Sequence, residues 1–225
     1  GNSAGNVTAS AAGALTTGAI TASGTTGNGA GQSGGNGGSI TLDAGGTSPV
    51  ITLLGSLNSS GGNQTGGTSG AGGDIRIKKD VLLNAATVAL DARGGNAGAG
   101  TGGNVQFDGT INSTGGVRAL TITAGTGEVT LAGTVGATSA LGNLTIAGND
   151  ISIATIGGAA AGAAATSLTA SNAGADTGDI AMNGAINVTG LTLNAGTSIS
   201  AANMIKAGTL AATLTGASSA LNLGA

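Results

Sequence analysis

The sequence predicts an all-β protein, a right-handed parallel β-helix (β-solenoid) with rungs of about 19–30 residues and Gly-rich corner loops. Three observations predict this fold: a strand-like phrase recurs at a steady interval, glycine occupies 48 of 225 positions, and a single aromatic residue is present. Right-handed crossovers are the strong default for parallel strands. We expect residues 1–225 to form one solenoid segment.

The composition excludes several other classes of protein. Glycine at this frequency disfavours long helices, because an interior Gly costs about 1 kcal/mol relative to Ala. Collagen requires Gly at every third position with abundant proline, and the chain has one Pro. Only 7% of residues are charged and the mean hydropathy is +0.32, which is unlike a disordered chain. No apolar stretch of about 18 residues predicts a transmembrane segment.

The recurring phrase places two apolar residues around a polar one, followed by a small break and another apolar residue. Alternation of this kind is typical of a strand with one buried face. From opening to closing residue the step is six positions in each copy except Ile151 to Ile156, where it is five. Successive openings lie 24, 30, 24, 22, 29 and 19 residues apart. The openings are Ile51, Ile75, Val105, Val129, Ile151, Ile180 and Ile199.

A second phrase lies between these openings and has the same period. It begins at Leu120, Leu144, Leu168 and Leu191, at intervals of 24, 24 and 23 residues, and Leu210 follows after 19. A shared period of about 24 residues falls in the range of solenoid rungs. Each rung cannot bury its apolar face alone and has to stack on its neighbours.

Three regions leave alternatives open. The register of residues 1–50 is uncertain, since Ile20 and Ile40 could be the second and first phrase of one rung or belong elsewhere. The Ala-rich insertion 158–166 could be a short helix or a loop. The Gly-rich stretches 27–38, 60–73 and 94–103 could be flexible surface loops or an extended, hydrogen-bonded ridge.

The phrases Leu120-Thr121-Ile122-Thr123-Ala124-Gly125-Thr126-Gly127-Glu128-Val129-Thr130-Leu131 and Leu141-Gly142-Asn143-Leu144-Thr145-Ile146-Ala147-Gly148-Asn149-Asp150-Ile151-Ser152-Ile153 carry a family resemblance. Residues from about 50 to 225 resemble the repeat region of large bacterial exoproteins of the filamentous-haemagglutinin type. The resemblance implies a right-handed parallel β-helix, export by a partner transporter, and a role in adhesion, aggregation or matrix. The family's Asn-Pro-Asn-Gly-Ile secretion signature is absent from this sequence.

Catalytic residue patterns are missing from the sequence, and we expect no enzyme and no cofactor. The chain has no His to act as a general base and no Cys nucleophile, so a Ser-His-Asp triad is impossible. Some β-helix enzymes cleave polysaccharides with carboxylates and a basic residue, but here Arg93 and Arg118 are isolated in sequence.

Acidic residues recur directly before the opening residue of a rung. They are Asp74, Glu128, Asp150 and Asp179, with Asn104 at the same place before Val105. Stacked carboxylates about 5 Å apart repel each other, and calcium could offset the repulsion. The alternative is that Asp and Asn cap the turn by binding backbone amides.

Threonine predicts a second column, on an exposed strand face. Thr121, Thr145, Thr169 and Thr192 occupy the outward middle position of the second phrase. A regular Thr array could bind ice, a glycan or another surface. The alternative is that Thr is simply favoured on exposed strands.

These observations favour a structural or adhesive extracellular shaft or fibre segment of a bacterial surface protein, with a ligand-binding solenoid module as the alternative. The expected partners are copies of the chain or adjoining rungs, because neither terminus shows a capping repeat. Cell-surface or host glycans are further candidates, and Arg76, Lys78 and Lys79 form the one dense basic patch. Six basic residues do not predict nucleic-acid binding.

Overall fold

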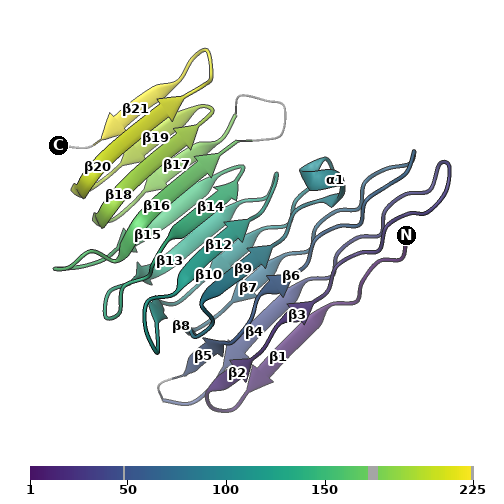
Figure 1. Ribbon diagram of the computed structural model, residues 1–225, viewed down its shortest axis with the longest axis horizontal. Coiled ribbons are helices and arrows are strands. Elements are labelled where there is room, and N and C mark those ends of the chain that lie inside the picture. The colour runs from purple at the N-terminus through teal and green to yellow at the C-terminus, as the bar shows by residue number, and fades with distance from the viewer. Residues whose placement is uncertain (48, 172–176, 224–225) are drawn as a thin grey trace.

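The fold is a stack of parallel strands that coils from one end of the molecule to the other (Figure 1). It is described by a computed structural model that covers residues 1–47, 49–171 and 177–223. Among these residues the named strands all pair in parallel, each with strands of the adjacent turns. The predicted parallel β-solenoid is confirmed. The sheet does not close, so the first and last turns leave open edges.

The strands form three faces. The first face consists of β1 (Val7–Ala11), β4 (Ile40–Ala44), β7 (Ile75–Ile77), β10 (Val105–Phe107), β13 (Val129–Val135), β15 (Ile151–Ile156), β17 (Asp179–Met182), β19 (Ser198–Ala201) and β21 (Ala220–Leu223). The second face consists of β2 (Leu15–Thr17), β5 (Val50–Leu53), β8 (Asp80–Leu83) and β11 (Ile111–Ser113), continued by the ends of β13 and β15. The third face consists of β3 (Ile20–Thr21), β6 (Leu57–Asn58), β9 (Thr87–Asp91), β12 (Ala119–Thr123), β14 (Leu144–Gly148), β16 (Ala163–Ala170), β18 (Ile186–Ala195) and β20 (Ile205–Leu214). Strands β18 and β20 begin on the second face and continue onto the third.

The core lies between the faces and is built from apolar columns that run along the stack. On the first face Ile75 pairs with Val105, and the column continues through Val129 and Ile151 to Ile180 and Ile199. These side chains are at most 1% exposed. Alternation along each strand points every second residue inward. The inward residues of stacked rungs form the columns, and these columns are filled almost entirely by aliphatic side chains. The single aromatic, Phe107, is fully buried in the neighbouring column between Ile77 and Leu131.

The predicted openings from Ile75 to Ile199 share one column, but the assignment of Ile51 is wrong. Ile51 pairs with Val81 on the second face, and Ile40 takes the opening position by pairing with Ile75. Apolar-x-apolar phrases occur on all three faces, so the phrase alone does not identify the face. The rungs that begin at Val7 and Ile40 contain 33 and 35 residues, longer than expected, because each contains a Gly-rich excursion.

The structure also explains two irregularities in the sequence pattern. The five-residue step to Ile156 corresponds to a register shift between Leu131 and Thr134, after which Val135 pairs with Ile156. The insertion 158–166 forms no helix: it is a loop up to Gly162, and β16 begins at Ala163.

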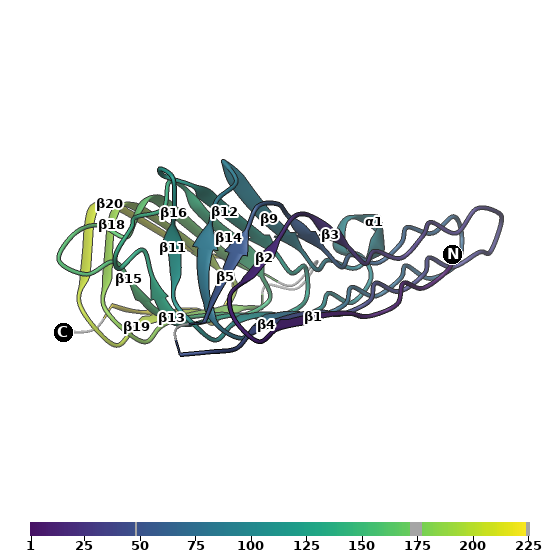
Figure 2. The same ribbon diagram turned by 90° about the horizontal axis from the view of Figure 1, so that it is seen from below.

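The Gly-rich stretches are ordered and form a projection that we call the Gly arm, residues 1–6, 22–39, 59–74 and 92–104. Figure 2 shows it extending from the broader body of the solenoid, with the short helix α1 (Gly95–Gly98) at its side. Its hydrogen bonds recur every third residue: the amides of Gly34, Gly37 and Ile40 donate to the carbonyls of Thr68, Ala71 and Asp74 at 2.8–2.9 Å. Three residues per turn is the period of the polyproline II helix.

Close packing explains why two of every three residues in the Gly-Gly-x triplets of the arm, such as residues 34–39, are glycine. A Cβ on Gly37 would overlap the carbonyl oxygen of Ser59, and one on Gly38 would overlap that of Gly5. The third position, for example Asn36 and Ser39, lies at the outside and accommodates a side chain. The structure therefore favours the extended, hydrogen-bonded ridge over flexible loops.

Candidate functional surfaces

The predicted acidic residues lie in one column at the edge of the first face, where each precedes an inward residue of that face. The amide of Asn104 donates to Asp74 Oδ1 at 2.8 Å, and the amide of Asp179 donates to Asp150 Oδ1 at 2.9 Å. Ser198 Oγ donates to Asp179 Oδ1 at 2.7 Å. These oxygens accept bonds from the next rung, which is the turn-capping alternative.

A calcium site is not assembled in this column. Asn104 separates Asp74 from Glu128 and accepts the amide of Glu128 at 2.8 Å. Within residues 1–47, 49–171 and 177–223, no group of three or more acidic side chains converges as metal ligands would. The chemistry that the column performs is hydrogen bonding between rungs.

Asn and Ser residues of the Gly arm extend the same pattern, and this was missed in the sequence. Asn36 Oδ1 accepts the amide of Ala71 at 2.9 Å, and Asn6 Oδ1 accepts the amide of Ser39 at 2.9 Å. Ser3 Oγ accepts the amide of Asn36 at 3.1 Å. We call these contacts, together with those of Asp74, Asn104 and Asp150, the side-chain ladder. The available signal was the triplet Gly-Gly-x, which has Asn or Asp at its third position in Asn36, Asp74 and Asn104.

The predicted Thr column is only partly formed. Thr121 pairs with Thr145, but the next residues in that column are Ser167 and Thr192. Thr169 was assigned there wrongly: it lies one outward column away, beside Ala147 and Asn194. The alignment made from the sequence is two residues out of register at this rung. Thr166, and not Leu168, lies between Leu144 and Leu191. Both Thr166 and Leu168 point inward, so either alignment buries the core.

The outward side of the third face is nevertheless rich in hydroxyl groups. Thr145 and Thr192 are exposed, and Ser167 between them is partly exposed. Strands β12, β14, β16, β18 and β20 contain one charged residue, Lys206, which lies where β20 still follows the second face. At Gly190 the surface dips into a shallow hollow of about 340 Å³, bordered by Thr145, Ser167 and Thr209.

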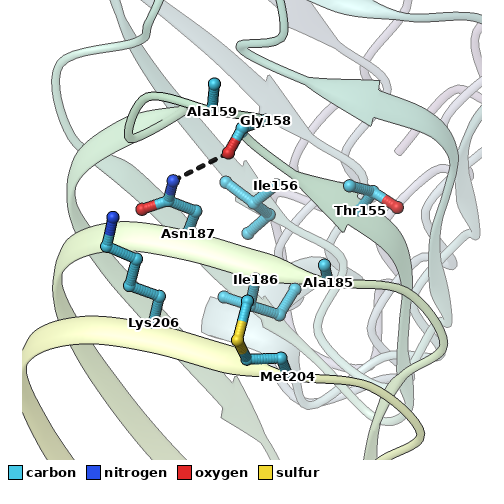
Figure 3. A pocket seen from close by; sticks show the side chains of 10 residues that line it. Thr155, Ile156, Gly158, Ala159, Ala185, Ile186, Asn187, Met204 and Lys206 are labelled. Atoms are coloured by element: carbon cyan, nitrogen blue, oxygen red, sulfur yellow. Dashed lines mark hydrogen bonds between the residues drawn. The ribbon is translucent and has the colours of Figure 1, made fainter.

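A second hollow, of about 290 Å³, lies on the second face near the last rungs (Figure 3). Ile156, Ile186 and Met204 supply its apolar lining, and Lys206 lies at its rim. Asn187 Nδ2 donates to the carbonyl oxygen of Gly158 at 2.8 Å, which ties the loop above the hollow to the next rung. The hollow offers one cation and no cluster of groups for catalysis.

The basic patch is largely neutralised by ion pairs. Arg76 lies 2.9 Å from Asp108 on the following rung, and Lys78 lies 3.5 Å from Asp43 on the preceding one. Arg93 lies 2.7 Å from Asp91. Hydrogen bonds to Asp91 raise the pKa of Arg93, assisted by the charge of that carboxylate and opposed by partial burial. The first two pairs join rungs, as the side-chain ladder does.

Comparison with protein-family models, curated proteins and solved structures finds no match to this chain. In the described part of the chain, no helix has both the length and the apolar character needed to cross a bilayer.

Proposed function

We propose that this chain is a non-catalytic structural segment, a shaft or fibre portion of a bacterial surface or secreted exoprotein of the filamentous-haemagglutinin-like type. One observation carries the proposal: the polar contacts of the first-face edge link one rung to the next along the stack. Asp74 accepts the amide of Asn104, and Arg76 pairs with Asp108. Such contacts resist bending and extension of a rod, and they use polar groups that a binding or catalytic site would need.

The order of the Gly arm supports the same proposal. Its outer amides bind side chains of the preceding rung, as Ala71 does with Asn36. These bonds also run from one rung to the next, so the arm adds to the contacts that hold the stack together.

The location can be tested in the source cell with a membrane-impermeant amine reagent. Lys206 is exposed and Lys78 and Lys79 are partly exposed. A surface shaft should be labelled in intact cells to the same extent as in lysed cells. Labelling only after lysis would contradict the proposal.

The structural role can be tested by removing one repeat. Deletion of residues 151–179 joins Asp150 to Ile180. Ile180 lies in the same column as Ile151, so Asp150 still directly precedes an inward residue of that column and keeps its place in the side-chain ladder. A shaft should remain folded and shorten by about 4.8 Å, the spacing of adjacent strands, while attachment of cells persists. Loss of attachment with a folded, shorter rod would show that the segment itself binds.

A second candidate function is ligand binding by the hydroxyl-rich third face, and the stacking of Thr121, Thr145, Ser167 and Thr192 favours it. The T145K/T192K variant should abolish binding to ice or glycan if this face binds. T130K is the matched control, because Thr130 points outward from the first face. Equal binding by both variants would exclude this function.

A further inference from the structure

The sequence contains three Asn-Gly pairs, which begin at Asn28, Asn36 and Asn183. An asparagine that precedes glycine can lose its side-chain amide without an enzyme, because glycine has no Cβ to obstruct the approach of its backbone nitrogen to the side-chain carbon. All three asparagines are exposed in the structure, so access to water does not separate them. Their hydrogen bonds do.

The reaction requires two groups to be free. The backbone nitrogen of the glycine gives up its proton and bonds to Cγ of the asparagine, the C–N bond of the side-chain amide breaks, and the amide nitrogen leaves as ammonia with that proton. Water then opens the succinimide ring and leaves an aspartyl or an isoaspartyl linkage. The glycine N–H and the asparagine carboxamide therefore both have to leave their hydrogen-bond partners.

Asn36 belongs to the side-chain ladder, and both of its reacting groups are bound. Its Oδ1 accepts the amide of Ala71 at 2.9 Å, and the amide of Gly37 donates to the carbonyl oxygen of Ala71 at 2.8 Å. One residue of the next rung therefore holds the attacking nitrogen and the carboxamide at the same time. Opening one such bond lowers the reactive population about fivefold, and opening both lowers it about thirtyfold.

Asn28 has neither restraint. It lies in the turn of the first layer of the Gly arm, where the amide of Gln32 donates to the carbonyl oxygen of Gly29 at 3.2 Å. Among the described residues, no hydrogen bond joins the Asn28 side chain or the Gly29 amide to another group of the protein. Both reacting groups are therefore free.

Asn183 is intermediate. It follows β17 at the corner of the first face, and its Nδ2 donates to Ser152 Oγ of the preceding rung at 3.0 Å. In the part of the chain that the structure describes, the amide of Gly184 has no acceptor. The carboxamide of Asn183 is thus bound, whereas the attacking nitrogen is free.

We propose that Asn28 and Asn183 are sites of spontaneous deamidation and that the side-chain ladder protects Asn36 from the same reaction. The ladder then has a second role besides joining rungs, because it keeps a reactive Asn-Gly pair of the arm intact. Each conversion adds one negative charge to the formal net charge of −3. The inference goes beyond the proposed shaft function and does not depend on it.

The matched control on the chain itself is Ser152→Ala against Ser200→Ala. Ser152 and Ser200 lie in the same outward column of the first face, on either side of Ala181, and only Ser152 binds the Asn183 side chain. Ser152→Ala should raise the rate of deamidation at Asn183 about fivefold and leave that at Asn28 unchanged. Ser200→Ala should change neither. An unchanged Asn183 rate in Ser152→Ala would overturn the restraint assigned to that bond.

The decisive experiment incubates the full chain at mildly alkaline pH, once folded and once in concentrated urea, and follows each asparagine by tandem mass spectrometry of thermolysin peptides. In the folded chain Asn28 should convert fastest, Asn183 about fivefold more slowly and Asn36 about thirtyfold more slowly, according to the bonds that each has to break. In urea the three rates should become similar. Equal rates in the folded chain would overturn the proposal. The same differences in urea would also overturn it, because they would come from the neighbouring residues and not from the fold.

Discussion

The amide of Asn104 donates a hydrogen bond of 2.8 Å to the carboxylate of Asp74, the residue at the same position one rung earlier. This contact is the turn-capping bond that the sequence offered as the alternative to a calcium site, and it holds neighbouring rungs together. The backbone amide of Ile75 donates to the carbonyl of Asn104, and the amide of Asn104 itself donates to the side chain of Asp74. Asn, Asp and Ser are suited to this role because they reach a backbone group nearby.

Substitution at Asp74 tests the ladder. Asp74→Ala removes the acceptor and should lower the free energy of unfolding by about 1 kcal/mol, the usual net value of such a bond. Asp74→Asn keeps an acceptor oxygen and should remain close to the parent in urea denaturation. An Asn variant as unstable as the Ala variant would show that the hydrogen bond is not what Asp74 contributes.

The packing of the Gly arm predicts a contrast between two glycines. Gly37→Ala should destabilise the arm by about 1–3 kcal/mol, the common cost of overpacking, because the added methyl overlaps the carbonyl of Ser59. Gly5→Ala is the matched control, since a Cβ there meets nothing within 4 Å. Hydrogen exchange at Ala71 reports on the arm. Equal protection in the two variants would mean that the segments are not packed as described.

The buried aromatic predicts a large effect in the core. Phe107→Ala should cost about 3–5 kcal/mol, because it opens a cavity between Ile77 and Leu131. Val117→Ala, at a side chain that is 68% exposed, should change the stability little. Thermal unfolding of both variants measures the difference. A mild Phe107 variant would argue that this column is not continuous.

The ion pair between rungs predicts a small and salt-sensitive effect. Arg76→Ala should lower stability by less than about 1 kcal/mol, since the Arg76 side chain is half exposed. The difference from the parent should shrink at high ionic strength because salt screens exposed charges. Urea denaturation at low and high salt gives the comparison, and a loss unaffected by salt would point to packing by the arginine stem.

The sequence was sufficient for the fold because strand alternation and a common period are local properties. It was insufficient to predict the pairing register of a strand where a shift by two residues leaves the same face of the strand buried. Thr166 and Leu168 both point inward. Aligning Leu168 with Leu144 is therefore compatible with a buried core, but it places Thr169 in the wrong column. The Gly arm was ambiguous for another reason: a packed Gly-Gly-x layer and a flexible loop share the same composition. Only the third residues, such as Asn36, distinguish them.

The register of Ile51 provides the most direct test of the account that each rung stacks in the order described. The chain has no cysteine, so engineered pairs report without interference. Thr52 pairs with Leu82 in the structure, whereas the sequence phrases alone align Thr52 with Arg76. Adjacent parallel strands lie about 4.8 Å apart, within the range in which two Cα atoms can be bridged by a disulfide. Under mild oxidation T52C/L82C should form the disulfide and T52C/R76C should not. A disulfide only in T52C/R76C would contradict the stacking order on which the ladder, the arm and the proposed shaft depend.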